Sequence, residues 1–65
     1  MADDYYRKLK RLLKDAGCTF VRRNASSHET WFSPTTGLSF TVPDPCKRRH
    51  TANGILKDAG IKTKL

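Results

Sequence analysis

Residues 28–42, HETWFSPTTGLSFTV, have the pattern of two strands joined by a turn. LSFTV (38–42) alternates apolar and polar residues, which is typical of a strand with one buried face. HETWFS (28–33) has the aromatic and β-branched residues of a second strand. Between them, Pro34 fixes its φ angle and Gly37 tolerates a positive one, as tight turns require. The stretch therefore predicts a β-hairpin.

A third strand and two helices are predicted on either side of this hairpin. CTFVRR (18–23) is β-branched and aromatic and favours a strand. The word LKDAG occurs at 13–17 and again at 56–60, and each copy closes an apolar stripe of helical period. Gly17 and Gly60 then supply the left-handed residue that commonly ends a helix. The expected N-caps are Asp3 or Asp4 for the first helix and Thr51 for the second.

The predicted order of elements is helix, strand, strand, strand, helix. Three antiparallel strands have one face to cover, and two short amphipathic helices on that face are enough to cover it. The prediction is an α+β fold like that of the double-stranded RNA-binding domain, formed as one domain by residues 1–65. A chain of 65 residues buries a small core, so its stability should be marginal.

The charge of the chain points to a polyanionic partner. Thirteen Lys and Arg stand against six Asp and Glu, for a formal charge of +7. Nucleic acid is the usual counterpart of such a field, whereas an anionic membrane fits less well because the basic residues do not flank a strongly apolar helical face. The N-terminus has no apolar signal region, and no apolar run reaches membrane-spanning length. We therefore expect a cytoplasmic protein that binds nucleic acid and does not associate with membranes.

Cys18 and Cys46 stand 28 residues apart, outside any zinc-binding spacing. Two cysteines and two scattered histidines do not suggest a four-ligand site. The two thiols are predicted to be buried and free in a reducing cytosol, and neither a metal nor a cofactor is expected.

His28 has two interpretations. It is either a solvated turn residue or a catalytic group, because histidine takes and returns a proton near neutral pH without help from a metal. Trp31 and Phe32 follow on the same predicted strand, where adjacent side chains face opposite ways. Trp31 is expected in the core because the chain has one Trp, while the place of Phe32 stays open. His50 is either a second acid or base or a polar residue flanking the cap of the second helix, and the second interpretation is favoured.

The basic residues fall into three groups. The run Lys47–Arg49 precedes the second helix, whose N-terminus carries partial positive charge, and together they suit a phosphate. Arg22 and Arg23 close the first strand near His28. On the first helix, a stripe at spacings of four and three is better explained as a solvated face; it consists of Arg7, Arg11 and Lys14.

Three stretches together resemble the HicA-type toxins, the small mRNA-interferase halves of bacterial toxin–antitoxin pairs. They are GCTFVRR (17–23), SSHETWFSPTTGLSFTVP (26–43) and RRHTANGILKDAGI (48–61). The resemblance runs from about Tyr5 to Ile61. The sequence departs from the family just before the histidine. Ser26 replaces the glycine that usually precedes the Ser-His pair, and Ala25 stands where the family usually has a basic residue.

This resemblance implies a double-stranded-RNA-binding-like fold and metal-independent endonucleolytic cleavage of mRNA, with the catalytic histidine at His28. It also implies a HicB-type antitoxin that covers this histidine, with the toxin monomeric alone and hetero-oligomeric with its antitoxin. The alternative is a small RNA-binding module that uses the same basic surface without chemistry. In either case the residues expected to contact RNA are Arg22, Arg23, Ser27, Lys47, Arg48 and Arg49.

Overall fold

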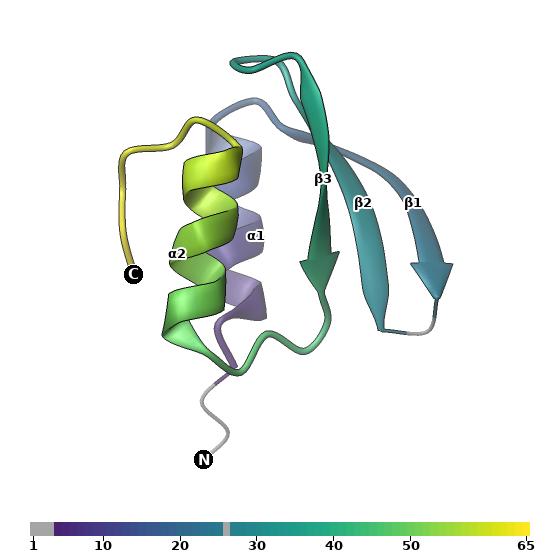
Figure 1. Ribbon diagram of the computed structural model, residues 1–65, viewed down its shortest axis with the longest axis vertical. Helices are drawn as coiled ribbons and strands as arrows, with labels where there is room; N and C mark the ends of the chain where they lie inside the picture. Colours follow the sequence, from purple (N-terminus) through teal and green to yellow (C-terminus); the bar gives the residue numbers. More distant parts are fainter. Residues whose placement is uncertain (1–3, 26) are drawn as a thin grey trace.

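The computed structural model describes residues 4–25 and 27–65, and it shows two helices and three strands (Figure 1). The N-terminal Asp3 and the family-variant Ser26 lie outside the described residues. In chain order the elements are α1 (Tyr6–Asp15), β1 (Thr19–Ala25), β2 (His28–Ser33), β3 (Leu38–Pro43) and α2 (Arg49–Asp58).

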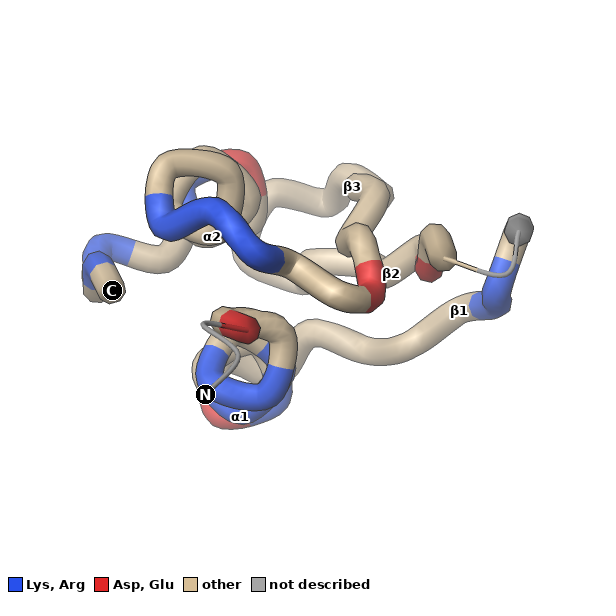
Figure 2. Tube along the Cα trace, turned by 90° about the horizontal axis from the view of Figure 1, so that it is seen from below, with Lys and Arg blue, Asp and Glu red and all other residues tan. Residues whose placement is uncertain are grey.

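The strands form one antiparallel sheet in the order β1-β2-β3. Both helices pack on the same side of this sheet, as is visible when the molecule is seen from below (Figure 2). This arrangement confirms the predicted α+β fold of the double-stranded-RNA-binding type. In the described part of the chain, neither helix has the length and apolar character of a membrane-spanning segment.

Strand β2 divides its side chains between the two faces of the sheet. Glu29, Trp31 and Ser33 are buried against the helices, whereas His28 and Phe32 are exposed. The alternation follows from the two-residue period of a strand, which sends successive side chains to opposite faces. Trp31 is 1 % exposed, which confirms its predicted place in the core. The outward face, free of helices, is therefore the face that carries His28.

Strand β3 follows the predicted alternation with one exception. Val42 is fully buried and Phe40 is partly buried against the core. Leu38 shares their face but is 63 % exposed, because it stands at the turn end of an edge strand, beyond the cover of the helices.

Strand β1 is longer than predicted and is irregular. It pairs with β2 through register shifts between Phe20 and Arg22 and again between Arg23 and Ala25. A bulge bends the bulged strand and changes which side chains face the core. As a result, Arg22 lies opposite Thr30 on the outward face, and its neighbour in sequence, Arg23, lies opposite Glu29 on the helix side.

The helix ends were predicted correctly and the helix starts were not. Gly17 and Gly60 follow α1 and α2 with φ angles of 87° and 79°. Thr51, however, lies inside α2, whose N-cap residue is Arg48, so the predicted cap at Thr51 is wrong. Helix α1 has Tyr5 at its N-cap, although Asp4 still accepts a hydrogen bond from the amide of Tyr6 at 2.9 Å.

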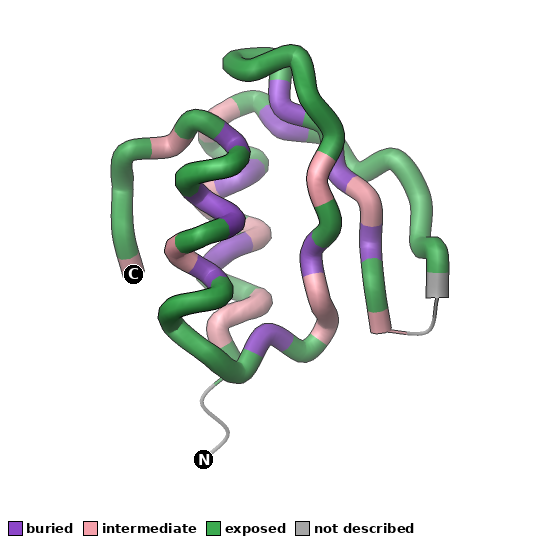
Figure 3. The backbone as a smooth tube through the Cα atoms, in the orientation of Figure 1, coloured by how far each residue is buried: buried purple, intermediate pink, exposed green. Residues whose placement is uncertain are grey.

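The core lies between the two helices and the inner face of the sheet (Figure 3). Both thiols are free and buried, as predicted. Burial raises the pKa of the Cys46 thiol, so this group stays protonated and packs as a small apolar side chain. The buried apolar residues are Leu9, Leu13, Cys18, Trp31, Val42, Cys46, Ala52, Ile55, Leu56 and Ala59.

Candidate RNA-cleaving site

One end of the molecule gathers the residues predicted to act on RNA. The turn between β1 and β2 and the start of α2 both lie at this end, together with the start of α1 (Figure 1). The amide of Asp44 donates to the carbonyl oxygen of Ser27 at 2.8 Å, and His28 pairs with Pro43 across the sheet. The loop that leads into α2 is thus bonded to the turn before His28. We call this end the basic end; it comprises residues 22–25, 27, 28 and 44–50.

His28 is exposed at the first position of β2, on the outward face of the sheet. Its Nδ1 lies 3.3 Å from the Oγ of Ser27. This contact occupies Nδ1 and leaves Nε2 available to another partner. Within residues 4–25 and 27–65, no three His, Cys, Asp or Glu side chains gather closely enough to hold a metal ion.

The basic run before α2 is exposed and lies at the first turn of the helix. Helix α2 begins at Arg49, so Lys47 and Arg48 precede it and Arg49 belongs to its first turn. Among the described residues, no side chain caps this helix and no acidic residue stands in its first turn. Its first amide groups and three cations therefore offer donors to an anion.

Asp4 fixes the position of this helix start. Its Oδ1 accepts hydrogen bonds from the amide of Tyr6, at the start of α1, at 2.9 Å and from the amide of Cys46, in the loop before α2, at 3.1 Å. The amide of Tyr5 donates to the carbonyl of Cys46 at 2.6 Å. The starts of α1 and α2 are consequently held together by the Asp4 carboxylate and one backbone hydrogen bond, which set the position of the basic run.

The two arginines of β1 lie on opposite faces of the sheet. Arg22 is exposed and lies on the outward face that also carries His28. Arg23 reaches the helix side, where its Nη2 lies 2.6 Å from Glu29 and 3.2 Å from Asp44. Figure 2 shows basic segments at the end of β1 and the start of α2, with acidic residues between them. Only Arg22 of this pair shares a face with the histidine.

A buried carboxylate lies directly behind His28. Glu29 is 3 % exposed, and its two oxygens accept hydrogen bonds from the hydroxyl of Tyr6, both at 2.9 Å. The indole nitrogen of Trp31 donates to Glu29 at 3.0 Å, and Arg23 forms a salt bridge with it. Charge-assisted bonds of this kind satisfy a carboxylate that burial would otherwise penalise. The sequence interpretation missed this group, although the alternation of HETWF does place Glu29 on the face of Trp31.

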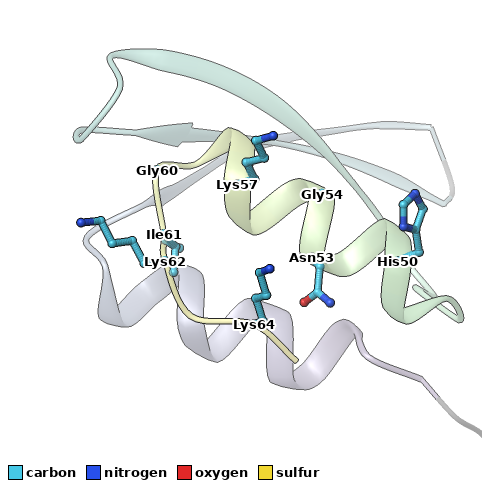
Figure 4. Close-up of a pocket in the computed structure, with 8 residues that line it drawn as sticks. All are labelled: His50, Asn53, Gly54, Lys57, Gly60, Ile61, Lys62 and Lys64. Carbon is cyan, nitrogen blue, oxygen red and sulfur yellow. The ribbon is translucent and has the colours of Figure 1, made fainter.

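His50 and the α1 stripe lie outside this arrangement. His50 is exposed within the first turn of α2 instead of flanking a cap at Thr51. It borders a hollow of about 650 Å³ between α2 and the C-terminal segment (Figure 4). The lysines around this hollow diverge, with the ammonium of Lys62 pointing away from it (Figure 4). The stripe on α1 is exposed along its length, as expected of a solvated helix face; it consists of Arg7, Arg11 and Lys14.

The three-stranded sheet, the helix pair on one face and the basic end define a small protein of the double-stranded-RNA-binding-domain type. A family model described as HicA toxin of bacterial toxin–antitoxin matches residues 6–61, so the chain belongs to the HicA toxin family. It is therefore the toxin of a toxin–antitoxin system, and an antitoxin is its partner. Searches of curated proteins and of solved structures gave no match.

The hydrogen bonds to Glu29 predict a change in stability at high pH. Burial, followed by the hydrogen bond to Glu29, raises the pKa of Tyr6 from 10.0 to about 12. The folded state therefore favours the neutral phenol, and this contribution is complete below pH 10 and is lost as the pH rises to about 12.

We expect Y6F to be less stable than the parent below pH 10, and we expect this difference to shrink as the pH approaches 12. Urea midpoints measured at several pH values test this, with Y5F as the matched control. A difference between parent and Y6F that stays constant from pH 10 to 12 would show that the Tyr6 proton is not linked to folding.

Proposed function

We propose that this chain is an endoribonuclease that cleaves mRNA without a metal ion, with His28 as its catalytic residue. The observation that carries the proposal is the exposure of His28 at the basic end, on the outward face that also carries Arg22. The chain would act in the cytoplasm, where its substrate is found. The HicA family match supports the proposal, since it establishes a toxin.

The chemistry requires little of the protein, because RNA carries its own nucleophile. The 2′-hydroxyl attacks the adjacent phosphorus as the bond from phosphorus to the 5′ oxygen breaks. His28 accepts the 2′-hydroxyl proton or protonates the departing 5′ oxygen, and Ser27 orients its ring through the contact at Nδ1. The remaining requirements are positioning and stabilisation of the charge on the phosphate.

The phosphates on either side of the cleaved bond are assigned to the exposed cations of the basic end. Arg22 binds a phosphate on the outward face, next to His28. The neighbouring phosphates are bound by the run Lys47–Arg49 and the first amides of α2. Arg23 was also predicted to bind RNA, but Glu29 and Asp44 already engage its guanidinium. We assign Arg23 to holding the turn before His28 in place.

The antitoxin is proposed to be of the HicB type and to inhibit by covering the basic end. An acidic partner surface would complement the formal charge of +7. A partner that binds the folded chain also stabilises it by mass action, which matters for a domain of this size. The free toxin is proposed to be a monomer and the inhibited form a hetero-oligomer.

The catalytic role is tested by cleavage of single-stranded RNA in EDTA. We expect the parent to cut, H28A to lose about 10²-fold or more of the rate, and H50A to keep it. Because His28 is exposed, H28A should melt close to the parent. A single 2′-deoxy substitution should block cutting at that site. RNA binding without His28-dependent cutting would favour the non-catalytic RNA-binding module.

The phosphate-binding role of the basic run is tested through the salt dependence of binding. Replacing Lys47, Arg48 and Arg49 with Ala should weaken the binding of a non-cleavable RNA. The slope of log K against log salt should fall by about 0.7 to 0.9 for each phosphate that is no longer neutralised. A triple replacement of Lys8, Lys62 and Lys64 removes the same charge elsewhere and serves as the control. Equal slopes for the two triple variants would rule out a specific role for the run before α2.

The mode of inhibition is tested by hydrogen exchange of the toxin with and without its antitoxin. Added protection is expected at residues 22–30 and 47–50, because occlusion shields the backbone around His28 and the basic run. The complex should also melt at a higher temperature than the toxin alone. An inhibited complex that leaves both segments unprotected would mean that inhibition does not work by covering the site.

A further inference from the structure

A groove of about 560 Å³ lies between α1 and the inner face of β1, on the side of the sheet away from His28. Tyr6, Lys10 and Lys14 form its helical wall. Phe20 of β1 forms the opposite wall, and Trp31 of β2 also lines it. Helix α1 therefore leaves part of the inner sheet face open on the β1 side.

The exposure of Phe20 in this groove is unusual for its position. Its partner across the sheet is Trp31, which is 1 % exposed, yet Phe20 is 49 % exposed. The two rings meet edge to face, with centroids 5.9 Å apart and planes at 82°. Trp31 thus supports the Phe20 ring from one side while the groove leaves it open to solvent. An aromatic ring held in this way can stack with a nucleobase.

The charges in the groove are separated along its length. Lys10 and Lys14 stand one helical turn apart on the α1 wall, and the ammonium of Lys10 lies 5.7 Å from the centre of the Tyr6 ring. At the other end, Glu29 and Asp44 are bridged by Arg23. The carboxylates disfavour a phosphate at their end, whereas the two lysines attract one at theirs.

We propose that this groove binds one nucleotide of single-stranded RNA, with its base against Phe20 and its phosphates at Lys10 and Lys14. The proposal rests on the proposed function, since it assigns a further subsite to the same substrate. The end of the groove at Asp44 adjoins the turn before His28, because the Asp44 amide donates to the Ser27 carbonyl. The groove therefore adjoins the segment that carries His28, so one RNA strand can contact both sites.

The test measures binding apart from cleavage. The probe is a short mixed-sequence RNA with 2′-O-methyl groups throughout, which cannot be cut through a 2′-hydroxyl. Trp31 is the one tryptophan of the chain and it lines the groove, so its fluorescence reports occupancy. We expect the RNA to quench this emission in the parent. F20L should weaken binding at least about fivefold through loss of stacking, and F20Y, which keeps the ring, should restore it.

Matched variants separate the groove from the rest of the surface. F32L alters the exposed aromatic on the outward face and should leave the affinity within about twofold of the parent. K10Q/K14Q should lower the salt slope by about 0.7 for each phosphate that is no longer neutralised. R7Q/R11Q removes the same charge from α1 and should lower it less. Melting curves of every variant identify any that fail to fold.

The outcomes distinguish the groove from the catalytic proposal. Three results would each overturn the proposal that the groove binds RNA. They are unchanged Trp31 emission on adding RNA, equal RNA affinities of F20L and F32L, and equal salt slopes for the two α1 double variants. If RNA binding depends on the groove but the chain does not cut RNA, the binding proposal is supported and the endoribonuclease proposal is not.

Discussion

The carboxylate of Glu29 is the group on which the arrangement of this small fold depends. It is buried, and its hydrogen-bonding partners come from α1, β1 and β2. Arg23 extends the set to Asp44 in the loop before α2. A buried charge without these donors would be strongly unfavourable, so the elements are held where the carboxylate is satisfied. In a chain of 65 residues with a small apolar core, this polar centre adds directional contacts that link α1, β1 and β2.

The same group explains why an exposed histidine can have a defined position. Glu29 and His28 are neighbours on one strand, and neighbours on a strand point to opposite faces. Anchoring the carboxylate on the helix side therefore orients the backbone that presents the imidazole on the open side. The bond between Asp44 and Ser27 fixes the turn from the other direction. The side chain proposed to act on RNA is free to meet a large substrate, while its backbone is held from within.

Local pattern predicted the fold well, and contacts between distant segments explain what it missed. The bounds of β2 were predicted from the aromatic and β-branched residues of 28–33, and the ends of both helices follow from Gly17 and Gly60. The burial of Glu29 depends on a tyrosine 23 residues earlier in the chain, which no local pattern reveals. The separation of Arg22 from Arg23 depends on the bulges of β1. His28 and the basic run could be proposed from the sequence because their chemistry depends on the residue type alone.

The bulges of β1 also bear on how this chain avoids aggregation. β1 is an edge strand, and the unpaired amides and carbonyls of such an edge can recruit a strand from another molecule. Two register shifts within Thr19–Ala25 break the regular spacing that a second strand would need to match. The exposed Arg22 adds charge repulsion between two copies of the same edge. The irregular edge thus favours solubility of the toxin during any interval in which it has no antitoxin bound.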